Sequence, residues 1–132
     1  MTAHPANSEM LDLLDRFLSA IGSGDIEGAR ACYAPDAKIW HNHDDVEQTV
    51  EQNLKVLAWM ARVLPKRNYR IVRREVLSDG ILQQHVLEAT LPDGTEWRMP
   101  ACVILRIQNG RITRLDEYLD SAAAAVLSAL GR

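Results

Sequence analysis

The first part of the chain carries hydrophobic residues at helical spacing. The apolar positions lie three or four residues apart, and the pattern ends at Gly-Ser-Gly over residues 22–24, which predicts an amphipathic helix with a glycine stop. Asp25 is suited to cap a second, short helix over residues 26–33, since its side chain can accept from free N–H groups of a first helical turn. The apolar stripe of the first helix consists of Met10, Leu14, Phe17 and Ile21.

A strand and a longer helix follow. Residues 37–43 are predicted as a strand, and Asp44 with Glu47 forms a capping pattern before a third helix that Pro65 ends. Trp59 widens the apolar surface of this helix, as expected for core packing or the lining of a pocket. The main apolar stripe consists of Val46, Val50, Leu54, Leu57, Ala61 and Leu64.

From residue 66 onward the apolar pattern alternates. A final alanine-rich segment over about residues 121–130 is predicted as a helix. Helices followed by an antiparallel meander predict an α+β fold in which N-terminal helices pack on a curved, cone-shaped antiparallel sheet. Turn sequences divide the alternating part into four strands, over about residues 67–77, 81–91, 95–107 and 111–119.

Composition narrows the function classes. The chain has 132 residues, and 15 Lys and Arg against 18 Asp and Glu give a net charge of −3. This predicts one domain over residues 1–132, with residues 1–7 flexible, and no overall positive field that would attract nucleic acid or anionic lipid. No segment has the ~20 apolar residues of a membrane span and none resembles a secretory leader, so we expect a cytoplasmic protein. Cys32 and Cys102 form no paired motif and are predicted to be buried thiols.

Three sequence motifs carry a resemblance to a known family. They are FLSAIGSGDIEG over residues 17–28, YAPDAKIWHN over residues 33–42 and NGRITRLDEYLD over residues 109–120. With the order of elements, they resemble the nuclear transport factor 2-like superfamily and its SnoaL-like, polyketide cyclase-like members, which are related to ketosteroid isomerase and limonene epoxide hydrolase. The resemblance implies an apolar pocket between helices and sheet, a small hydrophobic ligand and a homodimer. It is specific for fold and only weakly specific for reaction.

Ketosteroid isomerase chemistry needs a base and two strong oxyanion donors. His41 could serve as the base. The donor positions fall at Phe17 and near Cys102 or Val103, which cannot donate strong hydrogen bonds, so this reaction is not expected.

Limonene epoxide hydrolase chemistry uses an Asp-Arg-Asp set, with a tyrosine and an asparagine two residues apart. Asp120 matches the last-strand carboxylate, and Trp40-His41-Asn42 resembles the tyrosine-x-asparagine pair with only the asparagine intact. Glu88 can take the acid position, but Val86 stands where the bridging arginine would be. The set is therefore broken, and a hydrolase or hydratase remains open through a water held by Asp120 and either Asn42 or His41.

SnoaL-like cyclisation demands least of the protein. Asp120 with His41, and with His85 if it points inward, would supply the proton transfers of an aldol closure without a metal or an organic cofactor. We therefore expect a cofactor-free acid/base enzyme with Asp120 and His41 as catalytic residues. The alternative is a noncatalytic ligand-binding or dimerisation module with the same fold. The expected substrate-binding residues are Asn42, Trp40, Phe17, Trp59, His85, Glu88 and Tyr118.

Strand alternation tests which of these residues share a face. Lys38 lies on the same side as Trp40 and Asn42, and because lysine prefers solvent, His41 is expected to point inward. His85 and Glu88 cannot both face one pocket in a regular strand. Asp120 also has a structural alternative, as the N-cap of the last helix.

Two further clusters have competing explanations. His41, His43, Asp44 and Asp45 are metal-ligand types, but helix capping accounts for their spacing, and no metal is expected. A basic cluster before and on the second predicted strand could meet a phosphate or an acyl-carrier surface, or form a solvated outer face or a dimer contact. It consists of Lys66, Arg67, Arg70, Arg73 and Arg74.

Overall fold

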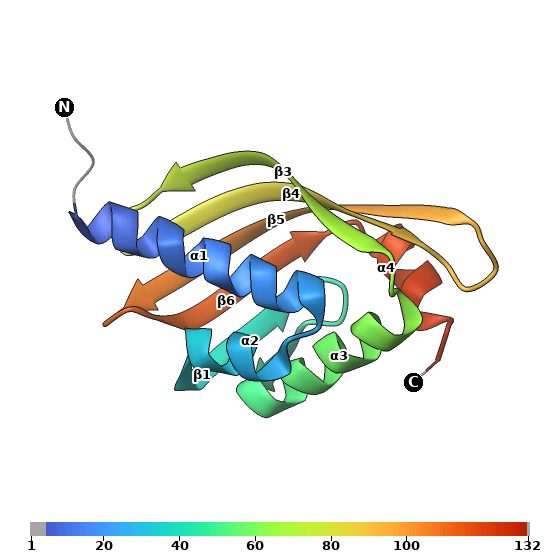
Figure 1. Ribbon diagram of the computed structural model, residues 1–132, viewed down its shortest axis with the longest axis horizontal. Coiled ribbons are helices and arrows are strands. Elements are labelled where there is room, and N and C mark those ends of the chain that lie inside the picture. The colour runs from blue at the N-terminus through green and yellow to red at the C-terminus, as the bar shows by residue number, and fades with distance from the viewer. Residues whose placement is uncertain (1–4, 132) are drawn as a thin grey trace.

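A computed structural model describes residues 5–131 of the chain. Its first half consists of two helices, two strands and a third helix, and four long strands make up most of the second (Figure 1). The helices are α1 (Pro5–Ser23), α2 (Ile26–Cys32), α3 (Val50–Val63) and α4 (Ser121–Ser128). The strands are β1 (Tyr33–His41), β2 (Val46–Thr49), β3 (Arg67–Val76), β4 (Gly80–Thr90), β5 (Glu96–Gln108) and β6 (Arg111–Leu119).

The expected flexible segment over residues 1–7 falls partly outside the described residues. Its remaining part, residues 5–7, is the first turn of α1.

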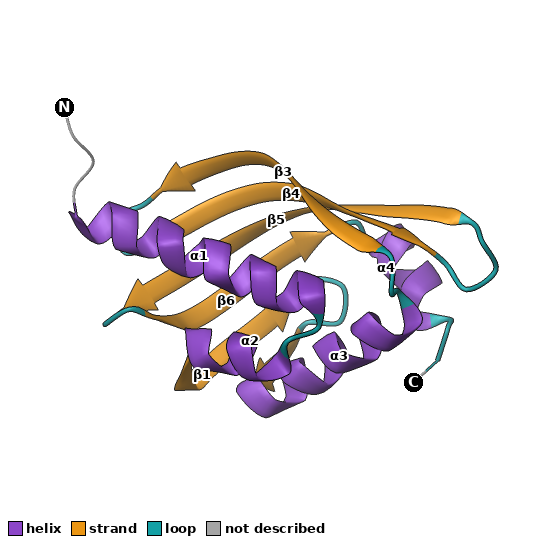
Figure 2. Ribbon diagram, in the orientation of Figure 1, coloured by secondary structure: helices purple, strands orange, loops and turns teal. Residues whose placement is uncertain are grey.

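The strands form one curved, open sheet in the order β2-β1-β6-β5-β4-β3. α1, α2 and α3 lie across one face of this sheet, and α4 lies beyond the end of β6 (Figure 2). This arrangement confirms the predicted α+β fold with N-terminal helices on a curved sheet. One neighbouring pair departs from the antiparallel arrangement, because β1 and β6 are parallel.

The start of α3 differs from the prediction. The helix begins at Val50, with Thr49 as its N-cap, and Thr49 and Gln52 form a reciprocal capping box. The predicted cap at Asp44 and Glu47 is wrong because residues 46–49 are strand β2, paired antiparallel with β1. The Asp44 carboxylate accepts instead from the Val46 N–H at 3.1 Å.

The apolar core consists of two clusters. One joins α1 and α2 to the sheet and includes Phe17 and Leu105. The other joins the end of α3 and α4 to the sheet and includes Trp59, Leu87 and Trp97. Residues of both clusters line the same cavity, so the cavity lies where the two clusters meet.

Two expectations from composition concern the burial of the cysteines and the lack of a membrane span. Both cysteines are free thiols; Cys32 is buried as predicted, whereas Cys102 is only half-buried. Among the described residues, no helix is both long enough and apolar enough to cross a membrane.

The arginines of the basic cluster make hydrogen bonds and ion pairs with different parts of the fold. Arg67 donates to the carbonyl oxygens of Leu64 and Ile21 and so ties β3 to α1. Arg70 and Arg73 pair with glutamates on the sheet. Arg74 is mostly buried and belongs to the candidate site described next. Much of the charge of the cluster is therefore balanced within the fold.

Candidate functional site

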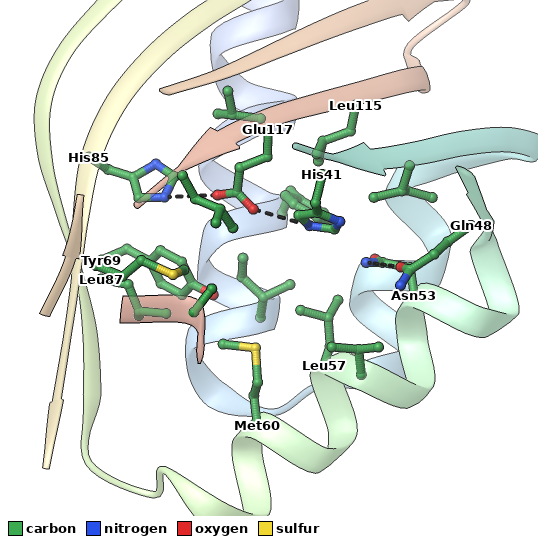
Figure 3. Close-up of a pocket in the computed structure, with 18 of the residues that line it drawn as sticks. His41, Gln48, Asn53, Leu57, Met60, Tyr69, His85, Leu87, Leu115 and Glu117 are labelled. Atoms are coloured by element: carbon green, nitrogen blue, oxygen red, sulfur yellow. Dashed lines mark hydrogen bonds and ion pairs between the residues drawn. The ribbon is translucent and has the colours of Figure 1, made fainter. Parts of the chain in front are cut away.

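An internal cavity of about 130 Å³ lies between the helices and the inner face of the sheet. Its walls are mainly apolar: α3 contributes Leu57 and Met60, which lie across the cavity from Glu117 of β6 (Figure 3). His43 and Asp44, in the turn after β1, are exposed lining residues and indicate where the cavity opens to solvent. A space of this size is close to one that accepts a benzene ring.

Three polar side chains that line the cavity, those of His41, Glu117 and Gln83, lie in one row across the sheet. The pairing register aligns His41 of β1 with Glu117 of β6, then Val103 of β5, Gln83 of β4 and Arg74 of β3. Directly paired residues of neighbouring strands project to the same face. The sheet therefore brings together groups that lie as far apart in the chain as His41 and Glu117.

Glu117 lies between two histidines (Figure 3). Its Oε1 is 3.1 Å from His41 Nε2, and its Oε2 is 3.5 Å from His85 Nε2. The exposed fractions of the three side chains are 16%, 15% and 4%, respectively. A carboxylate is thus held in a mainly apolar cavity by two imidazole rings.

The environment shifts the pKa values of this pair in opposite directions. Burial on its own would raise the pKa of Glu117, but its interactions with His41 and His85 outweigh burial and lower the pKa to about 2. Burial would lower the pKa of His41, but the hydrogen bond to Glu117 and its negative charge outweigh burial, and the pKa is raised. The preferred state near neutral pH therefore has an ionised Glu117 and favours protonation of His41.

Side chains behind His85 continue the polar network away from the cavity. Gln83 Nε2 lies 3.0 Å from His85 Nδ1, and both side chains are buried. Arg74 Nε donates to Gln83 Oε1 at 2.8 Å, and Arg74 Nη1 donates to Asp15 of α1 at 2.6 Å. The orientation of His85 thus depends on contacts that reach the surface of α1.

A second group of polar residues lies on the α3 side. The Tyr33 hydroxyl donates to Asn53 Oδ1 at 2.8 Å, and Asn53 Nδ2 donates to Gln48 Oε1 at 3.3 Å. Tyr69 reaches into the cavity from β3, with its ring edge-on to His85 at 5.5 Å between centroids (Figure 3). Burial and the nearby charge of Glu117 raise the pKa of Tyr69, so its hydroxyl remains a neutral donor.

Four of the residues expected from the sequence line the cavity. They are His41, Phe17, Trp59 and His85. His41 lies on the inner side of β1, where strand alternation predicted it. Within the described part of the chain, the Trp59 indole N–H also donates to the Gly131 carbonyl oxygen at 2.7 Å and so ties α3 to the segment after α4.

Asp120 and Asn42 do not line the cavity. Asp120 is exposed and caps α4, accepting from the Ala122 and Ala123 N–H groups at 2.9 and 3.3 Å. Asn42 exchanges two hydrogen bonds with the backbone of Leu119 at the end of β6. Both residues thus join elements near the cavity and do not project into it.

Three other expected residues lie on the outer side of the sheet or its edge. Glu88 pairs with Arg70 on β3. Trp40 and Tyr118 pack edge-on at 5.2 Å, and the Trp40 indole N–H donates to Asp45 at 2.7 Å. The physical reason is alternation, because the inner positions next to Trp40 and Tyr118 belong to His41 and Glu117.

Glu117 is the residue that the sequence analysis missed. The alternation of Leu115, Glu117 and Leu119 contained the signal, since two inward leucines place the residue between them on the same face. Tyr69 and Gln83 could have been found in the same way. For the described residues, no cluster of three or more His, Cys, Asp and Glu side chains has an arrangement suited to a metal ion.

A protein-family profile described as the SnoaL-like domain matches residues 14–115, which is most of the chain. The chain belongs to the SnoaL-like domain family. The matched segment contains His41 and His85 and ends two residues before Glu117. A search of curated proteins finds no match.

Solved structures with the same fold include SnoaL-like relatives of low sequence identity. Wild-type IdmH, a predicted polyketide cyclase from Streptomyces antibioticus, is 20% identical, with 90% of this chain and 97% of that chain covered and a TM-score of 0.78. A predicted SnoaL-like polyketide cyclase from Jannaschia sp. CCS1 is 16% identical, with 98% and 96% covered and a TM-score of 0.79. An epoxide hydrolase of the limonene type from M. tuberculosis is 16% identical, with 96% and 98% covered and a TM-score of 0.76. At these identities the likeness shows the SnoaL-like fold of this chain.

Proposed function

We propose that this SnoaL-like protein is a cofactor-free acid/base enzyme that acts on a small hydrophobic carbonyl compound, with Glu117 and His41 as its proton-transfer pair. The observation that carries the proposal is a carboxylate held against a histidine in a mainly apolar cavity. Pairs of titratable groups whose environments shift their pKa values apart are typical of acid/base sites. His41 keeps the catalytic role expected from the sequence, and Glu117 takes the role expected of Asp120.

The proposed reaction is an aldol ring closure. The Glu117 carboxylate takes a proton from a carbon next to a carbonyl group, and the C–H electron pair passes into the enolate. The enolate carbon forms a C–C bond with an acceptor carbonyl carbon, whose oxygen receives a proton from His41. Glu117 then returns its proton to His41, so the pair ends the cycle in its starting state.

The low pKa of Glu117 limits the substrate. A carboxylate with a pKa of about 2 is a weak base, so it can remove a proton only from an already acidic carbon. A carbon between two carbonyl groups has this property. The apolar lining of Leu57, Met60 and Leu87 favours a compact hydrophobic skeleton around that carbon.

Proton removal can be tested without the natural substrate. Ethyl 2-methylacetoacetate is a small β-keto ester with one hydrogen between its carbonyl groups, and NMR in D₂O follows the loss of that hydrogen. We expect the protein to accelerate the exchange over protein-free buffer, and Glu117→Gln to slow the catalysed exchange by roughly 10²-fold. Asp116→Asn is the matched control, because Asp116 precedes Glu117 but pairs with Arg114 outside the cavity. Equal exchange by the wild type and Glu117→Gln would contradict the proposal.

One observation favours the noncatalytic alternative. Several polar groups of the cavity are paired with each other, as Tyr33 is with Asn53 and Asn53 is with Gln48, which suits a protein that only binds a ligand. That alternative predicts that the β-keto ester binds, as judged by its NMR line widths, while its exchange rate stays that of buffer.

A further inference from the structure

Two buried donor atoms of the candidate site, Arg74 Nη2 and His85 Nε2, make no hydrogen bond to the described residues, and of the two only His85 belongs to a residue that lines the cavity. His85 Nε2 is buried and, among the described residues, makes no hydrogen bond. Its distance of 3.5 Å to Glu117 Oε2 is long for a hydrogen bond. A polar ring atom of a side chain that is only 4% exposed thus faces the cavity beside the carboxylate (Figure 3). Buried polar atoms without a partner are rare and call for an explanation.

The contacts behind His85 determine which ring nitrogen carries the proton. Gln83 Oε1 accepts from the Arg74 guanidinium, which can only donate, so the amide nitrogen of Gln83 points at His85 Nδ1. An amide nitrogen also only donates. Nδ1 must therefore accept, and the proton of the neutral ring lies on Nε2, toward the cavity.

The Gln83 amide is held in this orientation from both sides. Turning it over would place its NH₂ group against Arg74 and its oxygen against the His85 nitrogen. Arg74 is itself fixed by Asp15 at 2.6 Å, and Gln83 is fully buried. Protonation of His85 on Nδ1 would likewise set two N–H groups against each other.

We propose that His85 is the oxyanion-binding residue of this site, whose Nε2–H holds the carbonyl oxygen of the substrate and the enolate charge that forms there. Gln83 and Arg74 are positioning residues that act through His85. This inference rests on the proposed function, and it specifies the ligand further: an acceptor oxygen must lie beside the carbon that faces Glu117. A fixed neutral donor aimed at developing negative charge lowers the barrier because it needs no reorganisation during the reaction.

Ligand binding tests the role of His85 without turnover. Glu117→Gln imitates the neutral acid that exists after proton removal, and 4-nitrophenolate is a ring-sized imitation of the enolate with a strong absorbance. We expect Glu117→Gln to bind 4-nitrophenolate at least tenfold more tightly than Glu117→Gln/His85→Phe, since a hydrogen bond to a charged group is lost. Equal affinities would overturn the proposal.

A spectroscopic test on the wild type covers the case in which the double variant does not fold. The chain has four histidines, and ¹⁵N labelling of their rings separates protonated from unprotonated nitrogens. We expect the neutral ring of His85 to carry its proton on Nε2, and Gln83→Glu, which offers an acceptor in place of the amide, to place a proton on Nδ1. A wild-type proton on Nδ1 would overturn the positioning role of Gln83 and Arg74.

The two proposals can fail separately. Phenolate binding through His85 without exchange of the β-keto ester would contradict the proposed reaction and leave the oxyanion site standing. Exchange that depends on Glu117, with equal phenolate affinities, would leave the reaction standing and overturn the role of His85.

Discussion

A carboxylate in an apolar cavity is costly unless partners hold its charge, and Glu117 has two such partners. The sequence analysis found His41 through the family resemblance and strand alternation, and it included His85 on the condition that it points inward. It chose Asp120 because Asp120 ends a motif that carries the family resemblance, and it did not consider Glu117. In the structure β6 ends at Leu119, as predicted, and Asp120 takes its alternative role as the cap of the last helix. The signal for Glu117, its place between two inward leucines, was present but was not used.

Glu117 should control the titration of His41. In the wild type we expect a His41 pKa above its ordinary value of about 6.5, measured by NMR of the ring protons. In Glu117→Gln we expect it below that value, because burial then outweighs the remaining charge of Asp44. A raised pKa in both proteins would mean that Glu117 is not the cause.

His41 and Glu117 should also make the free energy of unfolding depend on pH, and the direction follows from their pKa shifts. Since folding raises the pKa of His41, the stabilisation is present in full below about pH 6.5 and is lost as the pH rises through the folded-state value. Since folding lowers the pKa of Glu117, its contribution is present above its ordinary value near 4.5 and is lost toward pH 2. In Glu117→Gln, the free energy of unfolding should show neither of these two losses.

At the scale of elements, period and turn chemistry predicted most helices and strands. The four strands of the second half lie close to their predicted ranges because a turn sequence separates each pair. β2 was missed because Val46 and Val50 are four residues apart and extend the helical stripe of α3 backward. In the structure Val46 is 50% exposed, so its place in that stripe was coincidental.

The start of α3 can be tested at its cap. Thr49→Ala should lower the free energy of unfolding by about 1 kcal/mol, because the hydroxyl that accepts from the Gln52 N–H is lost. Thr49→Ser keeps a hydroxyl and should recover most of the difference in denaturant titrations. If Thr49→Ala unfolds like the wild type, this capping box does not stabilise the helix.

At the scale of the whole molecule, the site depends on strand pairings that no local sequence pattern predicts. No turn connects β1 to β6, and their parallel pairing aligns His41 with Glu117 across most of the chain. Turn sequences predict hairpins between consecutive strands, so the sequence analysis predicted the antiparallel meander but not the pairing of β1 with β6. The expected homodimer and cytoplasmic location stay predictions.

The account is tested most directly by one ratio, the catalysed exchange rate of the β-keto ester in Asp120→Asn over that in Glu117→Gln. Asparagine caps a helix about as well as aspartate, so Asp120→Asn preserves α4 while removing the charge. With Glu117 as the base, Asp120→Asn keeps close to the wild-type rate and the ratio is roughly 10². A ratio below one, with Asp120→Asn inactive and Glu117→Gln active, would contradict the account and return the catalytic role to Asp120.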